Sequence, residues 1–196
     1  MSYMFTISPT QRKAIQILSY YVLPILLAVS AVTWVTDSVF VLLGQAALLA
    51  VTANLFIKPV SVIYPHPLFA LALTFRRELG VASFWMYLFH AMGMFLGRGL
   101  SLDMVYNPQG FIIWGAVASM GMWILGLTSN NLSQRLLKRN WKKVQMVAYA
   151  VLPIASFHAS KAEGEYAKFI LITGSFIILK TIQYVITQKR MVKPAA

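Results

Sequence analysis

The chain has 196 residues, of which 59% are hydrophobic and only 11% are charged. Soluble globular proteins carry about 25% charged residues, so this chain has too few charges to cover a water-facing surface, and lipid must cover most of it. The net charge of +12 would suggest nucleic-acid binding in a soluble protein. Here the basic residues lie between apolar runs, where they serve as topology signals, and we expect no nucleic-acid partner. The sequence has no cysteine, which excludes disulfides, zinc–thiolate sites and iron–sulfur clusters.

Six apolar runs follow one another along the chain. At about 20 residues per membrane-spanning helix, they predict a single all-α integral membrane domain, a six-helix bundle over residues 14–187, between an N-terminal segment (1–13) and a basic tail (188–196). The predicted spans are residues 14–35, 39–57, 79–96, 110–127, 144–159 and 169–187. The fifth span is expected to bend at Pro153, because proline cannot complete the helical hydrogen-bond pattern.

The segment after the second span contains two prolines, Pro65 and Pro67, on either side of His66. Prolines in this arrangement break a helix, so residues 59–75 are predicted to form a re-entrant or interfacial stretch. Two polar loops follow further along the chain: residues 98–109, which contain Asp103, and the strongly basic residues 128–143.

The distribution of lysine and arginine predicts the orientation, because these residues accumulate in the cytoplasmic loops of membrane proteins. With both termini on the cytoplasmic side, the outer loops hold only Arg98, Lys161 and Lys168. The inner side then holds Arg12, Lys13, Lys58, Arg76, Arg77, Arg135, Lys138, Arg139, Lys142, Lys143, Lys189, Arg190 and Lys193. The sequence therefore predicts a multi-pass protein with cytoplasmic termini, placed in the bacterial inner membrane.

Two of the three histidines lie inside predicted spans: His90 in the third and His158 near the outer end of the fifth. Ionisable residues inside a membrane are rare and mark functional sites, and neutral imidazole is a good axial ligand for haem iron. The alternative is that each histidine only hydrogen-bonds a neighbouring helix. His66 lies in the proline-flanked segment and is not expected to be a ligand. Arg76 and Arg77 are candidates for contact with a haem propionate or a quinone.

Three stretches carry a resemblance to a known family: residues 76–80 leading to His90, residues 127–130, and residues 141–145 leading to His158. Across about residues 40–187 the sequence resembles the ferric-reductase-like transmembrane domain family, in particular its MsrQ-like bacterial branch of membrane b-type cytochromes. The resemblance implies a haem-binding helical bundle that transfers electrons. It assigns His90 and His158 as ligands of an outer haem b.

In that family the fifth helix carries two histidines 13 residues apart, which hold two stacked haems. Here Gln145 stands at the inner position, 13 residues before His158. Glutamine is a poor ligand for haem iron, so the resemblance implies one haem rather than two. Because no nicotinamide, flavin or phosphate-binding motif is present, any oxidoreductase activity requires an outside electron donor, such as a membrane quinol or another subunit.

Two other functions remain open from the residues alone. The chain is short and has little mass outside the membrane, which also fits a non-catalytic accessory or scaffold subunit of a larger membrane complex; in a pigment–protein complex His90 and His158 would ligate chlorophyll magnesium. A small transporter is the weakest alternative, because no acidic relay or internal repeat is visible. The expected partners are membrane lipids and a second membrane or outer-side protein.

Overall fold

The computed structural model describes residues 7–33, 37–97 and 110–192. These residues are almost entirely helical and contain no strand, which confirms the all-α prediction. The predicted polar loop at residues 98–109, with Asp103, lies outside the described residues.

The first helix is continuous but irregular: α1 (Pro9–Ile17) passes through a π-helical turn (Leu18–Val22) into α2 (Leu23–Thr33). Ser8 begins it with a capping box, in which its side chain and that of Gln11 bond each other's backbone N–H groups. The π turn lies directly before Pro24. Proline lacks an N–H and its ring crowds the carbonyl four residues earlier, here that of Tyr20, which explains the local widening.

The second helix, α3 (Asp37–Ile63), is longer than the predicted span, which was expected to end at residue 57. It continues through Pro59, which is fully buried. Membrane helices tolerate proline when neighbouring elements accommodate the freed carbonyl, so Pro59 does not end this one. The expected break comes later, at residues 64–66. The short helix α4 (Pro67–Thr74) follows, with His66 as its N-cap residue.

Helix α5 (Arg76–Gly97) begins three residues earlier than predicted, so Arg76, Arg77 and Glu78 form its first turn. Helix α7 (Gly110–Thr128) matches the fourth predicted span closely. The fifth predicted span is divided: α9 (Arg139–Gln145) ends before residue 146, and α10 (Ala148–Glu163) continues from there through Pro153. The remaining elements are α8 (Asn131–Leu137) and α11 (Ala167–Val192).

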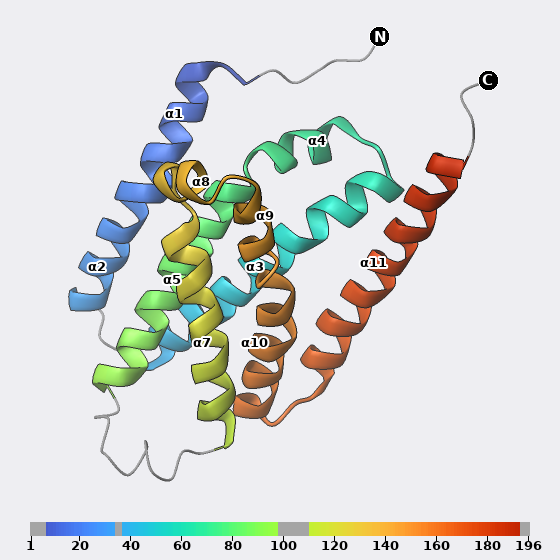
Figure 1. The fold of residues 1–196 in the computed structure, drawn as a ribbon. Coiled ribbons are helices and arrows are strands. Elements are labelled where there is room, and N and C mark those ends of the chain that lie inside the picture. The colour runs from blue at the N-terminus through green and yellow to red at the C-terminus, as the bar shows by residue number, and fades with distance from the viewer. Residues whose placement is uncertain (1–6, 34–36, 98–109, 193–196) are drawn as a thin grey trace.

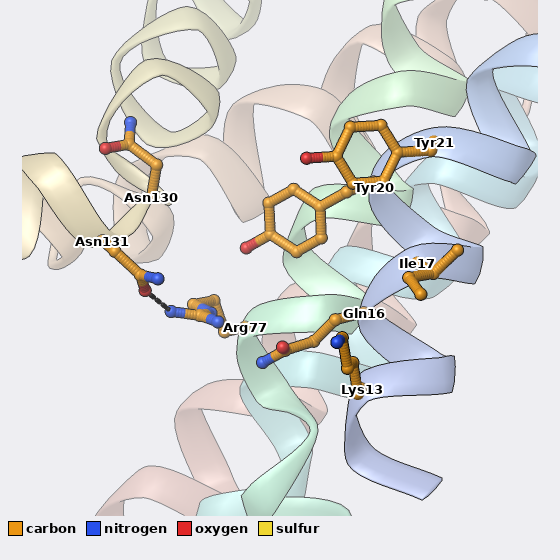
Figure 2. A pocket seen from close by; sticks show the side chains of 8 residues that line it. All are labelled: Lys13, Gln16, Ile17, Tyr20, Tyr21, Arg77, Asn130 and Asn131. Carbon is orange, nitrogen blue, oxygen red and sulfur yellow. Dashed lines mark hydrogen bonds between the residues drawn. The ribbon is translucent and has the colours of Figure 1, made fainter. Parts of the chain in front are cut away.

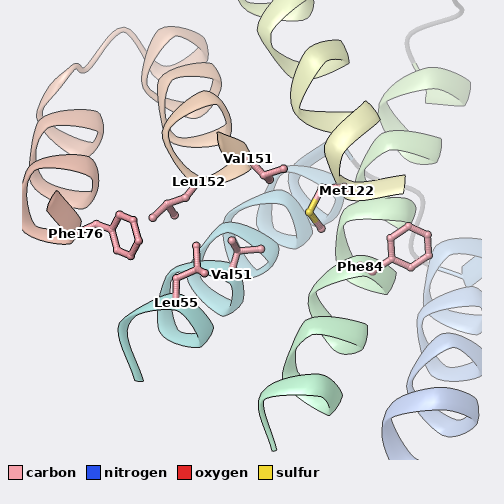
Figure 3. Packing of buried hydrophobic residues seen from close by; sticks show 7 residues of the cluster. All are labelled: Val51, Leu55, Phe84, Met122, Val151, Leu152 and Phe176. Carbon is pink, nitrogen blue, oxygen red and sulfur yellow. The ribbon is translucent and has the colours of Figure 1, made fainter. Parts of the chain in front are cut away.

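The core lies where α3, α5, α7, α10 and α11 meet, and the first helix lies at the edge of the bundle beside α5 (Figure 1). Figure 3 shows seven buried apolar side chains that these five helices contribute to one cluster: Val51, Leu55, Phe84, Met122, Val151, Leu152 and Phe176. The outward faces of the helices expose many large apolar side chains. Such a surface is stable only where lipid covers it, in agreement with a multi-pass integral membrane protein.

Five described helices are long and apolar enough to cross a membrane. They are Pro9–Ser30, Ser38–Ile63, Arg76–Leu96, Gly110–Thr128 and Ala167–Met191. Helix α10, in the fifth predicted span, has 16 residues, fewer than the roughly 20 that a full crossing needs, so this span and the total of six stay predictions. The start of α1 and the end of α11 lie at the same end of the bundle as α4, α8 and α9 (Figure 1).

A polar brace joins α3 to the first turn of α5. The Nδ2 of Asn54 donates to the carbonyl oxygen of Arg76 at 2.8 Å, and the Nε of Arg76 donates to the Oδ1 and carbonyl oxygen of Asn54 at 3.0 and 3.2 Å. Because lipid offers no alternative partner, these bonds fix how α3 and α5 meet.

We expect Asn54→Ala to lower the free energy of unfolding by roughly 1–2 kcal/mol, since interhelical hydrogen bonds in membranes average about 0.6 kcal/mol each. The measurement is the thermal midpoint in detergent, followed by fluorescence-detected size exclusion. Thr181→Ala is the control, because the Thr181 hydroxyl bonds only its own helix, at Ile177. Equal midpoints for the two variants would contradict the role of the brace.

Candidate functional site

His90 lies in the second half of α5 and reaches across to the beginning of α3. Its Nδ1 lies 2.7 Å from the carbonyl oxygen of Phe40. A carbonyl oxygen can only accept a hydrogen bond, so Nδ1 carries the proton and donates it. The other ring nitrogen, Nε2, is then the unprotonated one, and no hydrogen bond is recorded for it among the described residues.

His158 repeats this arrangement on the other pair of helices. It lies near the end of α10, and its Nδ1 lies 2.7 Å from the carbonyl oxygen of Phe111, at the beginning of α7. By the same argument Nδ1 is the donor, and Nε2 carries a free lone pair. Both histidines are therefore held as the tautomer that binds a metal ion through Nε2, with a backbone carbonyl orienting the ring.

A glycine makes each of these hydrogen bonds possible. In an α-helix, a carbonyl points toward the residue four positions later, and the side chain at that position leans back over it. Four positions after Phe40 and Phe111 stand Gly44 and Gly115. A Cβ on Gly44 would lie 2.6 Å from the His90 Nδ1, and one on Gly115 would lie 2.8 Å from the His158 Cε1. The missing side chains open both carbonyls to the imidazoles.

A second contact between α3 and α5 runs the other way, from a side chain of α3 to a glycine of α5. Phe40 is buried, and its ring packs against Gly93, where a Cβ would lie only 1.9 Å from the Phe40 Cδ1. Gly93 is three residues after His90, on the same face of α5. The pairs His90–Gly44 and Phe40–Gly93 thus interdigitate, and together they hold the His90 ring against α3.

The two imidazoles face one another inside the bundle. Their ring centroids lie 6.5 Å apart, with 68° between the ring planes. Two imidazoles on opposite sides of one metal ion have centroids roughly 6 Å apart, because each metal–nitrogen bond is about 2 Å long. The spacing and the free Nε2 atoms therefore fit a pair of axial ligands.

The pair does not fit a simple protein-ligated metal ion. Zinc takes three or four protein ligands, yet the described residues contain no group of three or more histidine, cysteine, aspartate or glutamate side chains that could hold a metal. Haem iron takes four ligands from its own porphyrin and needs only one or two from the protein. The chemistry of this donor set therefore matches haem.

The third histidine is not part of this site. His66 accepts a hydrogen bond from the backbone N–H of Leu68 as the N-cap of α4, and its ring stacks on Tyr64 at 5.9 Å. That His66 is not a ligand stays a prediction. His90 lies in the half of α5 that is farther along the chain from α4, and His158 lies in the half of α10 that is farther from α9.

Gln145, thirteen residues before His158, bonds a residue at the end of α7. The Nε2 of Gln145 donates to the Thr128 Oγ1 at 2.9 Å, and the Trp141 Nε1 donates to the Thr128 carbonyl at 2.8 Å. Gln145 and Trp141 thus fasten α9 to the end of α7.

Arg76 and Arg77 lie thirteen or fourteen residues before His90 on α5, about 20 Å along a helix. They are therefore not in contact with the histidine pair. Arg76 belongs to the brace with Asn54, and the Arg77 Nη1 donates to the Asn131 Oδ1 at 2.6 Å. A role for either arginine in holding a cofactor stays a prediction.

Comparison with known proteins gives partial matches. The chain is 35% identical over 92 residues to the protein-methionine-sulfoxide reductase heme-binding subunit MsrQ of Brucella anthropi, covering 44% of this chain and 41% of that protein. It is 32% identical over 123 residues to the MsrQ of Brucella ovis, covering 60% of this chain and 53% of that protein. Part of this chain is therefore similar to MsrQ proteins. The chain spans about half the length of these curated relatives or less; no protein-family model and no solved structure matches it.

The names of these relatives agree with the kind of site that His90 and His158 form. The MsrQ proteins are named as haem-binding subunits, and a donor set suited to haem is what the facing imidazoles provide. Sequence reasoning found both histidines but missed their supports. The signal was present: Phe40–Gly44 and Phe111–Gly115 share a Phe-x-x-x-Gly spacing, each at the start of a helix that faces a histidine.

We expect Gly44→Ala and Gly115→Ala each to push an imidazole off its carbonyl and to cost about 1–3 kcal/mol, the range for an unmade buried hydrogen bond. Thermal midpoints in detergent measure this. Gly174→Ala is the control, because no atom lies within 4 Å of the position of its Cβ; it should be neutral or slightly stabilising, since alanine favours helix. If all three variants have the same thermal midpoint, Gly44 and Gly115 do not support the histidines.

Proposed function

We propose that this chain is a haem-binding electron-transfer subunit that holds a single haem b between His90 and His158. The observation that carries this proposal is the pair of imidazoles 6.5 Å apart, each anchored through Nδ1 to a carbonyl and each with Nε2 free. The similarity to proteins named as haem-binding subunits supports it. Bound haem would supply one-electron redox chemistry, while the chain's own residues orient the ligands and exclude water.

The composition supports a single haem. The sequence has three histidines, and the third, His66, caps α4. At the position where the resembling family carries an inner ligand, Gln145 is engaged with Thr128. No pair of imidazoles remains for a second haem, so we propose one haem, placed at the end of the bundle opposite α4, α8 and α9.

The proposed topology has six crossings, with α10 as the short one and both termini cytoplasmic. Two observations support it. An even number of crossings agrees with the start of α1 and the end of α11 lying at the same end (Figure 1). The basic residues of α8 and α9, among them Arg135, Arg139 and Lys142, lie at that end as well and favour the cytoplasmic side. The histidine pair then lies toward the outer face of a bacterial inner membrane.

An outer haem without an inner one sets requirements on donor and acceptor. Electrons cannot pass from the cytoplasm through a stacked haem pair, so we propose a quinol dissolved in the membrane, or another membrane subunit, as the donor. The acceptor is proposed to be a protein on the outer side or within the membrane. The relatives' name, a subunit of protein-methionine-sulfoxide reductase, supports a partner protein of this kind. The pigment-binding alternative is not favoured, because the relatives are named for haem.

The test is the reduced-minus-oxidised visible spectrum of protein purified from haem-supplied cells, with a pyridine haemochrome assay for stoichiometry. We expect about one haem b per chain, lost or strongly reduced in His90→Ala and His158→Ala, because each variant removes one axial ligand.

The controls for this test are His66→Ala and Gln145→Ala, which should keep the wild-type haem content since neither residue touches the pair. Size exclusion confirms that each variant is folded. A folded, haem-supplied chain without haem would overturn the proposal and leave the accessory-subunit function in its place.

A further inference from the structure

A cavity of about 370 Å³ opens between the first helix, α5 and the beginning of α8. Figure 2 shows the side chains that line it, with Lys13 and Gln16 from α1, Tyr20 from the π turn, Arg77 from α5 and Asn131 from α8 directed toward a common space. It lies at the end of the bundle that carries α8 and α9, far from the histidine pair, and the haem proposal does not use it.

The charges around this cavity do not cancel. Lys13 is exposed, and its amine has no hydrogen-bond or ion-pair partner among the described residues. Arg77 adds a second cation, and its Nη2 lies 3.6 Å from the Oε1 of Glu78, a carboxylate that is only 4% exposed. The Glu78 carboxylate offsets the positive charge of Arg77. The cavity therefore presents one net positive charge, which suits a monoanionic ligand.

The polar groups around the cavity are already fixed in position. The Arg77 guanidinium is held by its bond to the Asn131 Oδ1, and this bond leaves the Nδ2 of Asn131 as a further donor. The Tyr20 hydroxyl donates to the carbonyl of Ser129 at 2.9 Å, which fixes its ring as a wall. Fixed donors beside two cations recognise the oxygens of a phosphate ester well.

One side of the cavity is lined by largely apolar side chains and continues onto the outer surface of the first helix. Ile17 and Tyr21 line it with side chains that are 45% and 66% exposed, and the first helix buries little of its surface against the rest of the bundle. A ligand whose charged head enters the cavity can therefore lay apolar chains along the first helix. A ligand with both a charged head and apolar chains therefore fits this cavity better than a fully water-soluble one.

We infer that this cavity binds the headgroup of an anionic phospholipid, with the phosphodiester between Lys13 and Arg77. Basic pockets between transmembrane helices on the cytoplasmic side are recognised sites for such headgroups. The headgroup of phosphatidylglycerol carries one net negative charge, because no cation offsets its phosphodiester, and this matches the net charge of the cavity. The acyl chains lie against Ile17 and Tyr21.

Such a lipid would brace the first helix, which buries little of its surface against the bundle. Polar contacts from the first helix to the rest of the bundle include the Gln16 Nε2 to Glu78 Oε1 bond at 3.2 Å and the Tyr20–Ser129 bond. A phosphodiester on Lys13 and Arg77 adds a bridge from α1 to α5, and through Asn131 to α8. Anionic lipid should therefore raise the stability of the folded bundle by binding only the folded state.

The experiment titrates the full chain, purified in neutral detergent, with phosphatidylglycerol or with phosphatidylcholine of the same acyl length. The readout is the thermal midpoint, with native mass spectrometry to count retained lipids. We expect phosphatidylglycerol to raise the midpoint by roughly 2–6 °C near saturation, from ligand linkage and the size of the chain. Phosphatidylcholine should give a much smaller shift.

Variants then locate the site. Lys13→Gln and the double variant Lys13→Gln/Arg77→Gln should lose most of the phosphatidylglycerol-specific shift. Lys13→Gln keeps the Arg77–Asn131 bond and guards against simple misfolding. The charge-matched control is Lys142→Gln/Lys143→Gln, which removes two exposed lysines of α9 that do not line the cavity and should keep the shift.

Three results would overturn the inference. They are an equal shift with both lipids, a shift that survives in the Lys13 variants, and a shift that inorganic phosphate reproduces without lipid. The last would assign the cavity to free phosphate. Haem content measured in parallel keeps this result separate from the proposed function, because neither Lys13 nor the control lysines contact the histidine pair.

Discussion

Groups buried in a helical bundle that lipid surrounds have no water to bond, and this constraint determines how His90 and His158 are held. Each imidazole must satisfy its N–H inside the protein, and each does so on the carbonyl of a phenylalanine in a neighbouring helix. Helical carbonyls are normally covered by the side chain four residues later. Gly44 and Gly115 remove that cover, so the proton on each ring is fixed at Nδ1 and the Nε2 lone pairs are left for a ligand. The candidate site thus arises from helix packing itself.

The two halves of the bundle use their polar residues differently. In the half with the histidine pair, two symmetric His–carbonyl contacts leave metal-binding atoms free. In the half with α8 and α9, several polar side chains join neighbouring helices: Gln145 and Trp141 bond Thr128, and Arg76 bonds Asn54. Gln145, which stands thirteen residues before His158, is thus part of a contact between helices.

Much of this architecture could be predicted from the sequence. Low charge and long apolar runs were enough to predict a helical membrane protein, and His90 and His158 stood out because ionisable residues are costly in lipid. Their partners were missed, because the shared Phe-x-x-x-Gly spacing of residues 40–44 and 111–115 gains meaning only once each carbonyl is known to face a histidine, and Gly44 alone resembles any small residue at a helix contact. The predicted end of the second span, at residue 57, was wrong because Pro59 is tolerated inside a packed helix. The division of the fifth predicted span at residues 146 and 147 depends on contacts of α9 that the hydrophobic pattern does not encode.

If His90 and His158 together hold one haem, as proposed, electron paramagnetic resonance of the oxidised, haem-supplied protein would detect both imidazoles at its iron. Ferric haem held by two neutral imidazoles gives a low-spin signal, which would take the highly anisotropic form if the rings keep the 68° between their planes. The signal should integrate to about one haem iron per chain. A high-spin signal as the main species would mean that one axial position lacks its imidazole, and would contradict the account.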